Sequence, residues 1–184
     1  AGFFSAFVLQ KASFSTRLIE RGTDVSKRVQ GIKAFEDTGI FNPVANYAFG
    51  EGGAGTFSDG KLTSRSKHLP KEKRFMISSY IQGGAPEEIR YLAHPHLGSD
   101  NLRKIVLNLR DAFLEIGGTV LFETLLEDLR IEKGKVVEAL TPSGGIEADY
   151  FVLATGHSAY ETYRMLMRHG VVFHTKKFAI GCRV

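Results

Sequence analysis

A dense cluster of glycines constrains the fold of this chain more than any other feature. Five of its 20 glycines lie within residues 50–60, Gly-Glu-Gly-Gly-Ala-Gly-Thr-Phe-Ser-Asp-Gly, and a lysine follows. Because glycine loses the most backbone entropy on folding, such a cluster is typical of backbone that adopts positive φ or approaches a ligand closely. Loops of this kind direct several N–H groups at one anion. We therefore expect a ligand-contacting loop, with a flexible surface loop as the alternative. The candidate contacts are Gly52, Gly53, Gly55, Thr56, Ser58 and Lys61.

Two nucleotide-binding patterns match this loop by letter but lack the expected context. Residues 50–55 spell G-x-G-x-x-G, yet a dinucleotide fingerprint follows a strand and opens a helix. Here a proline-containing segment lies upstream and Gly60 breaks any helix downstream. Residues 55–61 spell G-x-x-x-x-G-K, but Leu62 stands where a P-loop carries the hydroxyl that holds Mg²⁺. A P-loop-type phosphate-binding protein is therefore the weakest of the alternatives.

The beginning of the sequence suggests a second part of a nucleotide site. Gly2 leads into an apolar run at residues 3–9 that predicts a buried helix, and residues 16–20 predict a short strand ending in Glu20. Glu20 follows Gly2 by 20 − 2 = 18 positions, close to the ~20-residue gap between fingerprint glycines and the ribose-binding acid. A carboxylate at that strand end can accept hydrogen bonds from both ribose hydroxyls. The alternative is an ordinary helix–strand pair with a surface glutamate.

This interpretation implies that the chain is a fragment. If Gly2 is the last glycine of a fingerprint, the first strand and two further glycines would precede Ala1. A further strand would be interrupted at residues 181–184.

The remaining elements follow from hydrophobic periodicity and turn residues. The fully apolar run at residues 150–154 predicts a strand buried on both faces of a parallel sheet. It leads into Thr155, Gly156 and His157 at the edge where open parallel sheets bind ligands. The other expected elements are helices over residues 71–82, 86–93, 100–116 and 159–169, a strand over 119–124, and a hairpin of 128–132 with 135–140.

Four segments together resemble the flavin-dependent oxidoreductases with a glutathione-reductase-type fold, and within them the "FAD-dependent dehydrogenase" family. They are Ala-Gly at residues 1–2 with Leu-Ile-Glu-Arg-Gly at 18–22, residues 49–63 around the glycine cluster, residues 83–89 with 94–98, and Ala-Asp-Tyr-Phe-Val-Leu-Ala-Thr-Gly-His-Ser-Ala at 148–159. The resemblance implies an α/β fold: a Rossmann-like FAD-binding domain of three layers, with a mostly parallel sheet and a small β-meander. This domain would comprise residues 1–64 and 98–184, truncated at both ends, with a helical insertion or cap at 65–97.

The same resemblance implies a function and a set of contacts. The protein would be an FAD-dependent oxidoreductase that passes hydride or electrons through FAD to an unknown small-molecule substrate, with NAD(P)H as a candidate electron donor. The fragment alone would be inactive. The flavin ring carries the redox chemistry, so no catalytic acid or base is predicted. An NAD(P)-binding module remains an alternative, because it uses the same Gly2–Glu20 arrangement. The implied cofactor contacts are Gly2, Glu20, Arg21, Gly52, Gly53, Gly55, Thr56, Ser58, Lys61, Thr155, Gly156 and His157.

Composition and charge exclude several classes of binding partner. The net charge of +4 comes from scattered basic residues rather than the organised stripe that nucleic-acid binding requires. No apolar run approaches the ~20 residues that span a bilayer. The single cysteine, Cys182, excludes a disulfide framework and a cysteine-rich zinc site, which favours a reducing intracellular compartment. His94 and His96 lack the acid or cysteine neighbours of a metal site, so no metal is expected. The sequence leaves the oligomeric state open.

Overall fold

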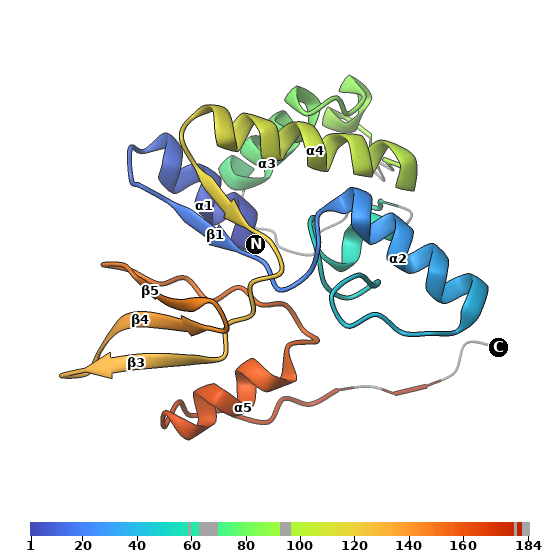
Figure 1. The fold of residues 1–184 in the computed structure, drawn as a ribbon. Coiled ribbons are helices and arrows are strands. Elements are labelled where there is room, and N and C mark those ends of the chain that lie inside the picture. The colour runs from blue at the N-terminus through green and yellow to red at the C-terminus, as the bar shows by residue number, and fades with distance from the viewer. Residues whose placement is uncertain (59, 63–69, 93–96, 179, 182–184) are drawn as a thin grey trace.

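The chain adopts a mixed α/β fold in the computed structural model, which describes residues 1–58, 60–62, 70–92, 97–178 and 180–181 (Figure 1). Part of the expected insertion, as well as His94, His96 and Cys182, lies outside the described residues. In chain order the elements are α1 (Gly2–Lys11), β1 (Arg17–Ile19), α2 (Val25–Thr38), the 3₁₀ helix η1 (Ala54–Phe57), α3 (Pro70–Gln82), the 3₁₀ helix η2 (Glu87–Arg90), α4 (Ser99–Glu115), β2 (Thr119–Leu121), β3 (Asp128–Glu132), β4 (Lys135–Thr141), β5 (Gly144–Glu147) and α5 (Tyr160–Arg168).

A two-stranded parallel sheet lies at the centre of the molecule. Strand β1 pairs with β2 in parallel, with Leu18 opposite Val120. Helices α1, α3 and α4 lie on one side of this pair, and the β3–β5 sheet and α5 lie on the other (Figure 1). The carboxyl end of β1 leads directly into the turn before α2, so this strand delivers Glu20 to the region of the glycine-rich loop.

Aromatic packing joins α1 to α4 above the parallel strands. Phe113 is completely buried, and its ring lies 5.9 Å from that of Phe3 in an edge-to-face arrangement. Gly118 is needed beside it, because a Cβ there would lie 2.4 Å from the Phe113 ring. The helix predicted for residues 100–116 is therefore confirmed, and one face of α4 packs into the core. Its buried members are Leu102, Ile105, Leu109 and Phe113.

The predicted hairpin is confirmed as part of a three-stranded antiparallel sheet. Strands β3 and β4 pair with Glu132 opposite Lys135, and β5 adds to the other edge of β4. The two turn residues, Lys133 and Gly134, have φ of 50° and 77°. Positive φ at both central residues is the geometry whose twist matches that of paired strands. Met165 of α5 is buried against this sheet.

Two secondary-structure predictions were wrong. Residues 150–154 form no strand, and Tyr150 is 84% exposed. An apolar run becomes a buried strand only if neighbouring strands satisfy its backbone groups, and no described strand pairs with this segment. Within the described residues only β1 and β2 pair in parallel, so the expected mostly parallel sheet is not seen there. The helix expected over residues 86–93 is reduced to the single turn η2, and residue 93 lies outside the described residues.

Candidate functional site

The glycine-rich loop is folded around one buried side chain, Arg28 of α2. Asp24 caps this helix by accepting hydrogen bonds from the N–H groups of Ser26 and Lys27. One turn further on, Arg28 is fully buried and extends into the loop, where its guanidinium lies 4.8 Å from the centre of the Phe57 ring. It donates to five backbone carbonyls: those of Asn46 from Nε (2.8 Å), Tyr47 from Nη2 (2.9 Å), and Gly50 (3.3 Å), Glu51 (2.8 Å) and Gly53 (2.8 Å) from Nη1.

Arg28 remains charged in this environment. Burial lowers the pKa of Arg28 to about 10, and the negative charges of Glu20 and Glu51 oppose that shift. A group with this pKa is protonated at pH 7. Burying a charge is costly unless it is hydrogen-bonded or paired, and here the carbonyl dipoles of the loop supply the hydrogen bonds. The loop conformation and the buried cation therefore stabilise each other.

Glycine is required at specific points of this loop. Gly50, Gly52 and Gly53 have φ of 115°, 82° and 73°, which other residues rarely adopt. A Cβ on Gly50 would also lie 2.6 Å from Arg28 Cδ, and one on Gly52 would lie 2.0 Å from Thr56 Oγ1. At Gly50 this requirement comes directly from the buried Arg28 side chain, and at Gly52 it comes from Thr56.

Glu51 fastens the loop to two helices. Its Oε2 accepts a 2.8 Å hydrogen bond from the N–H of Val25 at the start of α2, and it lies 3.1 Å from Nη1 of Arg110 on α4. The carboxylate is buried, and its Oε1 has no hydrogen-bond partner within the described residues. Burial raises the pKa of Glu51 above its usual value, although the Val25 hydrogen bond and Arg110 act in the opposite direction.

Glu20 joins the end of β1 to the same loop. Its Oε1 accepts hydrogen bonds from the N–H of Gly22 at 2.7 Å and from the N–H of Gly50 at 3.0 Å. The two backbones pack closely, since a Cβ on Gly22 would lie 2.4 Å from the nitrogen of Gly50. The predicted ribose-binding acid therefore lies against the glycine-rich loop.

The remaining candidate segments meet near the start of α1. A Cβ on Gly2 would lie 3.4 Å from Cβ of Ala154, which places Thr155 and Gly156 close to the amino end of α1. The Arg21 guanidinium stacks 4.1 Å from the centre of the Phe49 ring and lies 3.5 Å from Oε2 of Glu161 on α5. Arg21 thus connects the loop to the helix that follows residues 154–157.

The individual candidates differ in their exposure. Gly52, Gly55, Ser58, Lys61, Thr155, Gly156 and His157 are exposed, and Gly53 is half-buried. Thr56 is 2% exposed and its hydroxyl donates to the Glu51 carbonyl at 3.4 Å, so it supports the loop from within. The Ser58 hydroxyl donates to the Gly55 carbonyl at 2.7 Å. The Gly156 carbonyl accepts a 2.6 Å hydrogen bond from Tyr163, and the His157 ring packs edge-on against Tyr160.

Sequence reasoning missed Arg28, Glu51 and Arg110. One signal for Arg28 was present: it lies three residues after Val25 and four before Ile32, both buried. That spacing places an arginine on the apolar face of a helix, where a charged side chain needs internal partners. Glu51 carried no comparable signal, since its partners come from α2 and α4.

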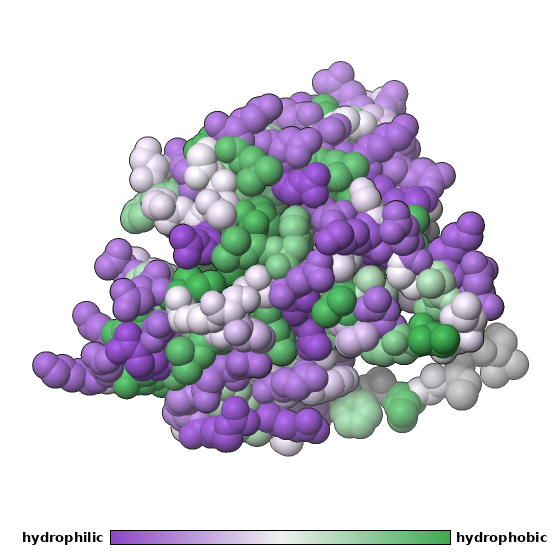
Figure 2. Space-filling view, in the orientation of Figure 1, coloured by the Kyte–Doolittle hydropathy of each residue, from purple (hydrophilic) through white to green (hydrophobic). Residues whose placement is uncertain are grey.

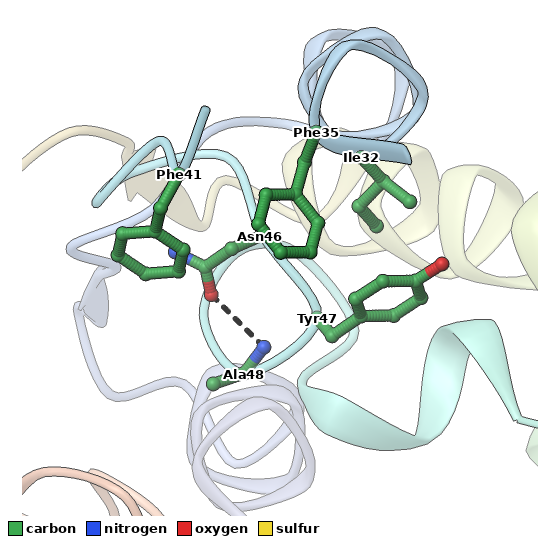
Figure 3. Close-up of a pocket in the computed structure, with 6 residues that line it drawn as sticks. All are labelled: Ile32, Phe35, Phe41, Asn46, Tyr47 and Ala48. Atoms are coloured by element: carbon green, nitrogen blue, oxygen red, sulfur yellow. Dashed lines mark hydrogen bonds between the residues drawn. The ribbon is translucent and has the colours of Figure 1, made fainter. Parts of the chain in front are cut away.

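A small apolar pocket is lined in part by Asn46 and Tyr47, whose carbonyls bind Arg28 (Figure 3). Its volume is about 160 Å³, below the ~300–1,000 Å³ of typical ligand sites. Asn46 shapes one wall, where its side-chain oxygen accepts a 2.9 Å hydrogen bond from the N–H of Ala48. The pocket is too small for a dinucleotide. It is lined by Ile32, Phe35, Phe41, Asn46, Tyr47 and Ala48.

Two other kinds of site are absent from the described part of the chain. Among those residues, no group of three or more histidine, cysteine, aspartate or glutamate side chains is arranged to hold a metal ion. None of the described helices is both long enough and apolar enough to cross a membrane.

Comparison with known proteins adds a relative without an assigned function. No family model matches the chain. The whole chain, 184 residues, is 40% identical to an uncharacterized protein of Clostridium beijerinckii. The match covers 34% of that protein, so the chain spans about a third of the length of this curated relative.

Proposed function

We propose that this chain is part of an FAD-dependent oxidoreductase and that Glu20 and the glycine-rich loop form part of its cofactor site. The observation that carries the proposal is the hydrogen bond from the Gly50 N–H to Glu20 Oε1. The sequence singled out these two segments separately, one by its strand-end acid and one by its glycines. Their direct contact is what a single nucleotide site requires.

The second carboxylate oxygen of Glu20 is available to bind a ribose. Its recorded hydrogen bonds within the described residues use Oε1 alone. Oε2 of this half-buried carboxylate has two lone pairs and remains for the two ribose hydroxyls, and charge-assisted hydrogen bonds are the strong ones. Glu20 would thus hold the adenosine ribose with one oxygen and the loop with the other.

The proposal includes a larger parallel sheet in the full-length protein. Strand β1 has β2 along one edge, and no described strand lies along the other. Residues 150–154 are apolar, yet Tyr150 and Val152 are 84% and 61% exposed. A strand between β1 and this segment would cover the exposed side chains and complete a three-layer, Rossmann-like domain. The greater length of the relative supports a larger protein.

The segment after α5 supports the same view. Its described residues lie along the lower right of Figure 2, and they combine exposed apolar side chains with the polar residues 174–177, His-Thr-Lys-Lys. Phe178 and Ile180 are 85% and 92% exposed. Exposed apolar side chains that gather on one segment mark a surface that another part of a protein can cover.

The chemistry assigned to the protein residues is binding and orientation. When bound, the flavin ring would supply the hydride or electron transfer, with NAD(P)H as a candidate donor and an unknown substrate. Glu20 would fix the ribose, and the loop backbone would present donors to cofactor oxygens. Gly156, with φ of 79° and open space where a Cβ would be, would allow close approach of the dinucleotide.

An NAD(P)-binding module is the second candidate, because the ribose contact of Glu20 suits either dinucleotide. Parallel titrations of the full-length apoprotein with FAD, NAD⁺ and ATP separate the possibilities. The proposal predicts saturable binding of FAD, with the flavin fluorescence changing on binding. Tighter binding of NAD⁺ than FAD would favour the nicotinamide module, and binding of ATP alone would favour a phosphate-binding protein.

A further inference from the structure

Arg28 differs from an ordinary buried arginine in what it binds. Within the described residues no carboxylate lies within ion-pairing distance of it, and its five recorded hydrogen bonds all go to backbone carbonyls of the loop. Glu20 and Glu51 act on its charge without direct contact. The side chain therefore fixes the orientation of peptide groups rather than neutralising an acid.

The orientation of these peptides determines where the loop directs its donors. Nη1 of Arg28 holds the carbonyl oxygens of Glu51 and Gly53, each at 2.8 Å. The chain contains no cis peptide among its described residues, and in a trans peptide the C=O and the following N–H point in opposite directions. The N–H groups of Gly52 and Ala54 therefore point away from the guanidinium. Both residues are exposed, and neither N–H donates a hydrogen bond within the described residues.

We propose that Arg28 is a positioning residue of the cofactor site: it holds the loop carbonyls inward so that the Gly52 and Ala54 N–H groups face acceptor oxygens of the cofactor. The N–H of Gly53 between them donates to the Gly50 carbonyl at 2.9 Å, so the two outward groups alternate along the loop. Outward backbone N–H groups of a turn can form a concavity that accepts anionic oxygens. Those oxygens belong either to the diphosphate or to the flavin ring. This inference rests on the proposed function and adds to it a residue that never touches the cofactor.

The geometry requires an arginine rather than any cation. A guanidinium presents five N–H donors in a planar fork, whereas a lysine ammonium presents three on a flexible stem. Arg28→Lys would retain the charge but leave loop carbonyls unpaired, and the outward donors would lose their alignment. Arg28→Lys and Arg28→Met should therefore both weaken FAD binding at least about tenfold, so lysine does not rescue the loss.

The test measures dissociation constants for FAD, ADP-ribose and riboflavin, together with thermal unfolding, on the full-length protein. Lys27→Met is the matched control, because Lys27 is the next residue on α2 and forms an exposed ion pair with Glu123. It should leave all three constants unchanged. ADP-ribose carries the diphosphate and riboflavin carries the ring, so the ligand whose affinity falls in the Arg28 variants identifies the oxygens that the loop contacts.

A second pair of variants tests the role of the loop conformation in cofactor binding if the Arg28 variants do not fold. Gly53 and Gly98 have φ of 73° and 74° with ψ of −170° and 148°, and a Cβ on either meets nothing within 4 Å. Gly53→Ala and Gly98→Ala thus introduce a similar backbone strain, but only Gly53 lies in the segment that wraps Arg28. Gly53→Ala should weaken FAD binding at least about tenfold, whereas Gly98→Ala should not change it.

Three outcomes would overturn this inference. They are wild-type affinity in Arg28→Lys, equal affinity in the two glycine variants, and equal loss of both partial ligands with a lowered unfolding temperature, which would show a purely structural role. If the wild-type protein binds no FAD, the proposed function fails and this inference fails with it. If the wild-type protein binds FAD and one of the three outcomes occurs, this inference fails alone.

Discussion

Glu20 and Gly50 are joined by a 3.0 Å hydrogen bond, in which the backbone N–H of the loop glycine donates to the carboxylate at the end of β1. Thirty residues separate the two in sequence, yet their backbones are in direct contact. A change at Glu20 should therefore affect both the loop and whatever ligand the carboxylate holds.

Glu20→Ala should weaken FAD binding by about 2–4 kcal/mol, if two charge-assisted hydrogen bonds to the ribose are lost and water recovers part of the loss. The same change leaves the N–H groups of Gly22 and Gly50 without their acceptor, so the free energy of unfolding should fall by about 1–3 kcal/mol. Titration of the full-length apoprotein and denaturant unfolding measure the two effects. Glu20→Gln keeps an acceptor oxygen and should lose less stability. Unchanged FAD affinity in Glu20→Ala would remove this residue from the site.

Gly156→Ala should reduce FAD affinity at least about tenfold, because a methyl group would intrude where the dinucleotide approaches the backbone. Gly170 provides a control: φ is 79° at Gly156 and 80° at Gly170, and a Cβ meets nothing within 4 Å at either position. Both alanine variants should lose stability, because residues with a side chain rarely adopt a φ near 80°. Isothermal titration and thermal unfolding distinguish the two contributions. Equal FAD affinity in the two variants would place the cofactor away from Gly156.

Glu51 should contribute a pH dependence to stability. Burial raises its pKa above 4.5 in the folded state, so between 4.5 and that raised value the folded protein binds more protons at this group than the unfolded chain. Stability from Glu51 therefore decreases as the pH rises through this interval, at most by about 1.4 kcal/mol per pH unit. Glu51→Gln cannot titrate and should lack this slope. Denaturant unfolding from pH 4 to 7 compares the two proteins, and parallel stability curves would show that the buried carboxyl does not shift.

Residues 150–154 should be protected in the full-length protein. If a neighbouring strand pairs with this segment there, its amide hydrogens would exchange slowly, whereas exposed amides exchange rapidly. The 184-residue chain alone should also unfold at a lower temperature and retain less FAD than a version extended by the upstream strand. Hydrogen exchange followed by mass spectrometry measures the first effect. Rapid exchange at these amides in the FAD-bound protein would refute the expected strand.

Local sequence patterns predicted most helices and the hairpin, because their determinants lie within a few residues. The glycine at 134 permits the tight turn between β3 and β4, and the 3.6-residue periodicity of α4 places Phe113 in the core. The run at 150–154 was predicted wrongly because a strand depends on its neighbours, which a sequence pattern cannot supply. Arg28 could have been identified from its place between Val25 and Ile32, but its five carbonyl partners depend on how the loop folds back.

The FAD content of purified full-length protein tests the central claim most directly. Heat denaturation releases non-covalent flavin, whose absorbance and fluorescence can be compared with the protein concentration. We expect about one FAD per chain, either as purified or after incubation with FAD, and a clear loss in Glu20→Ala. Protein that is folded but colourless, and that takes up no FAD on titration, would contradict the account.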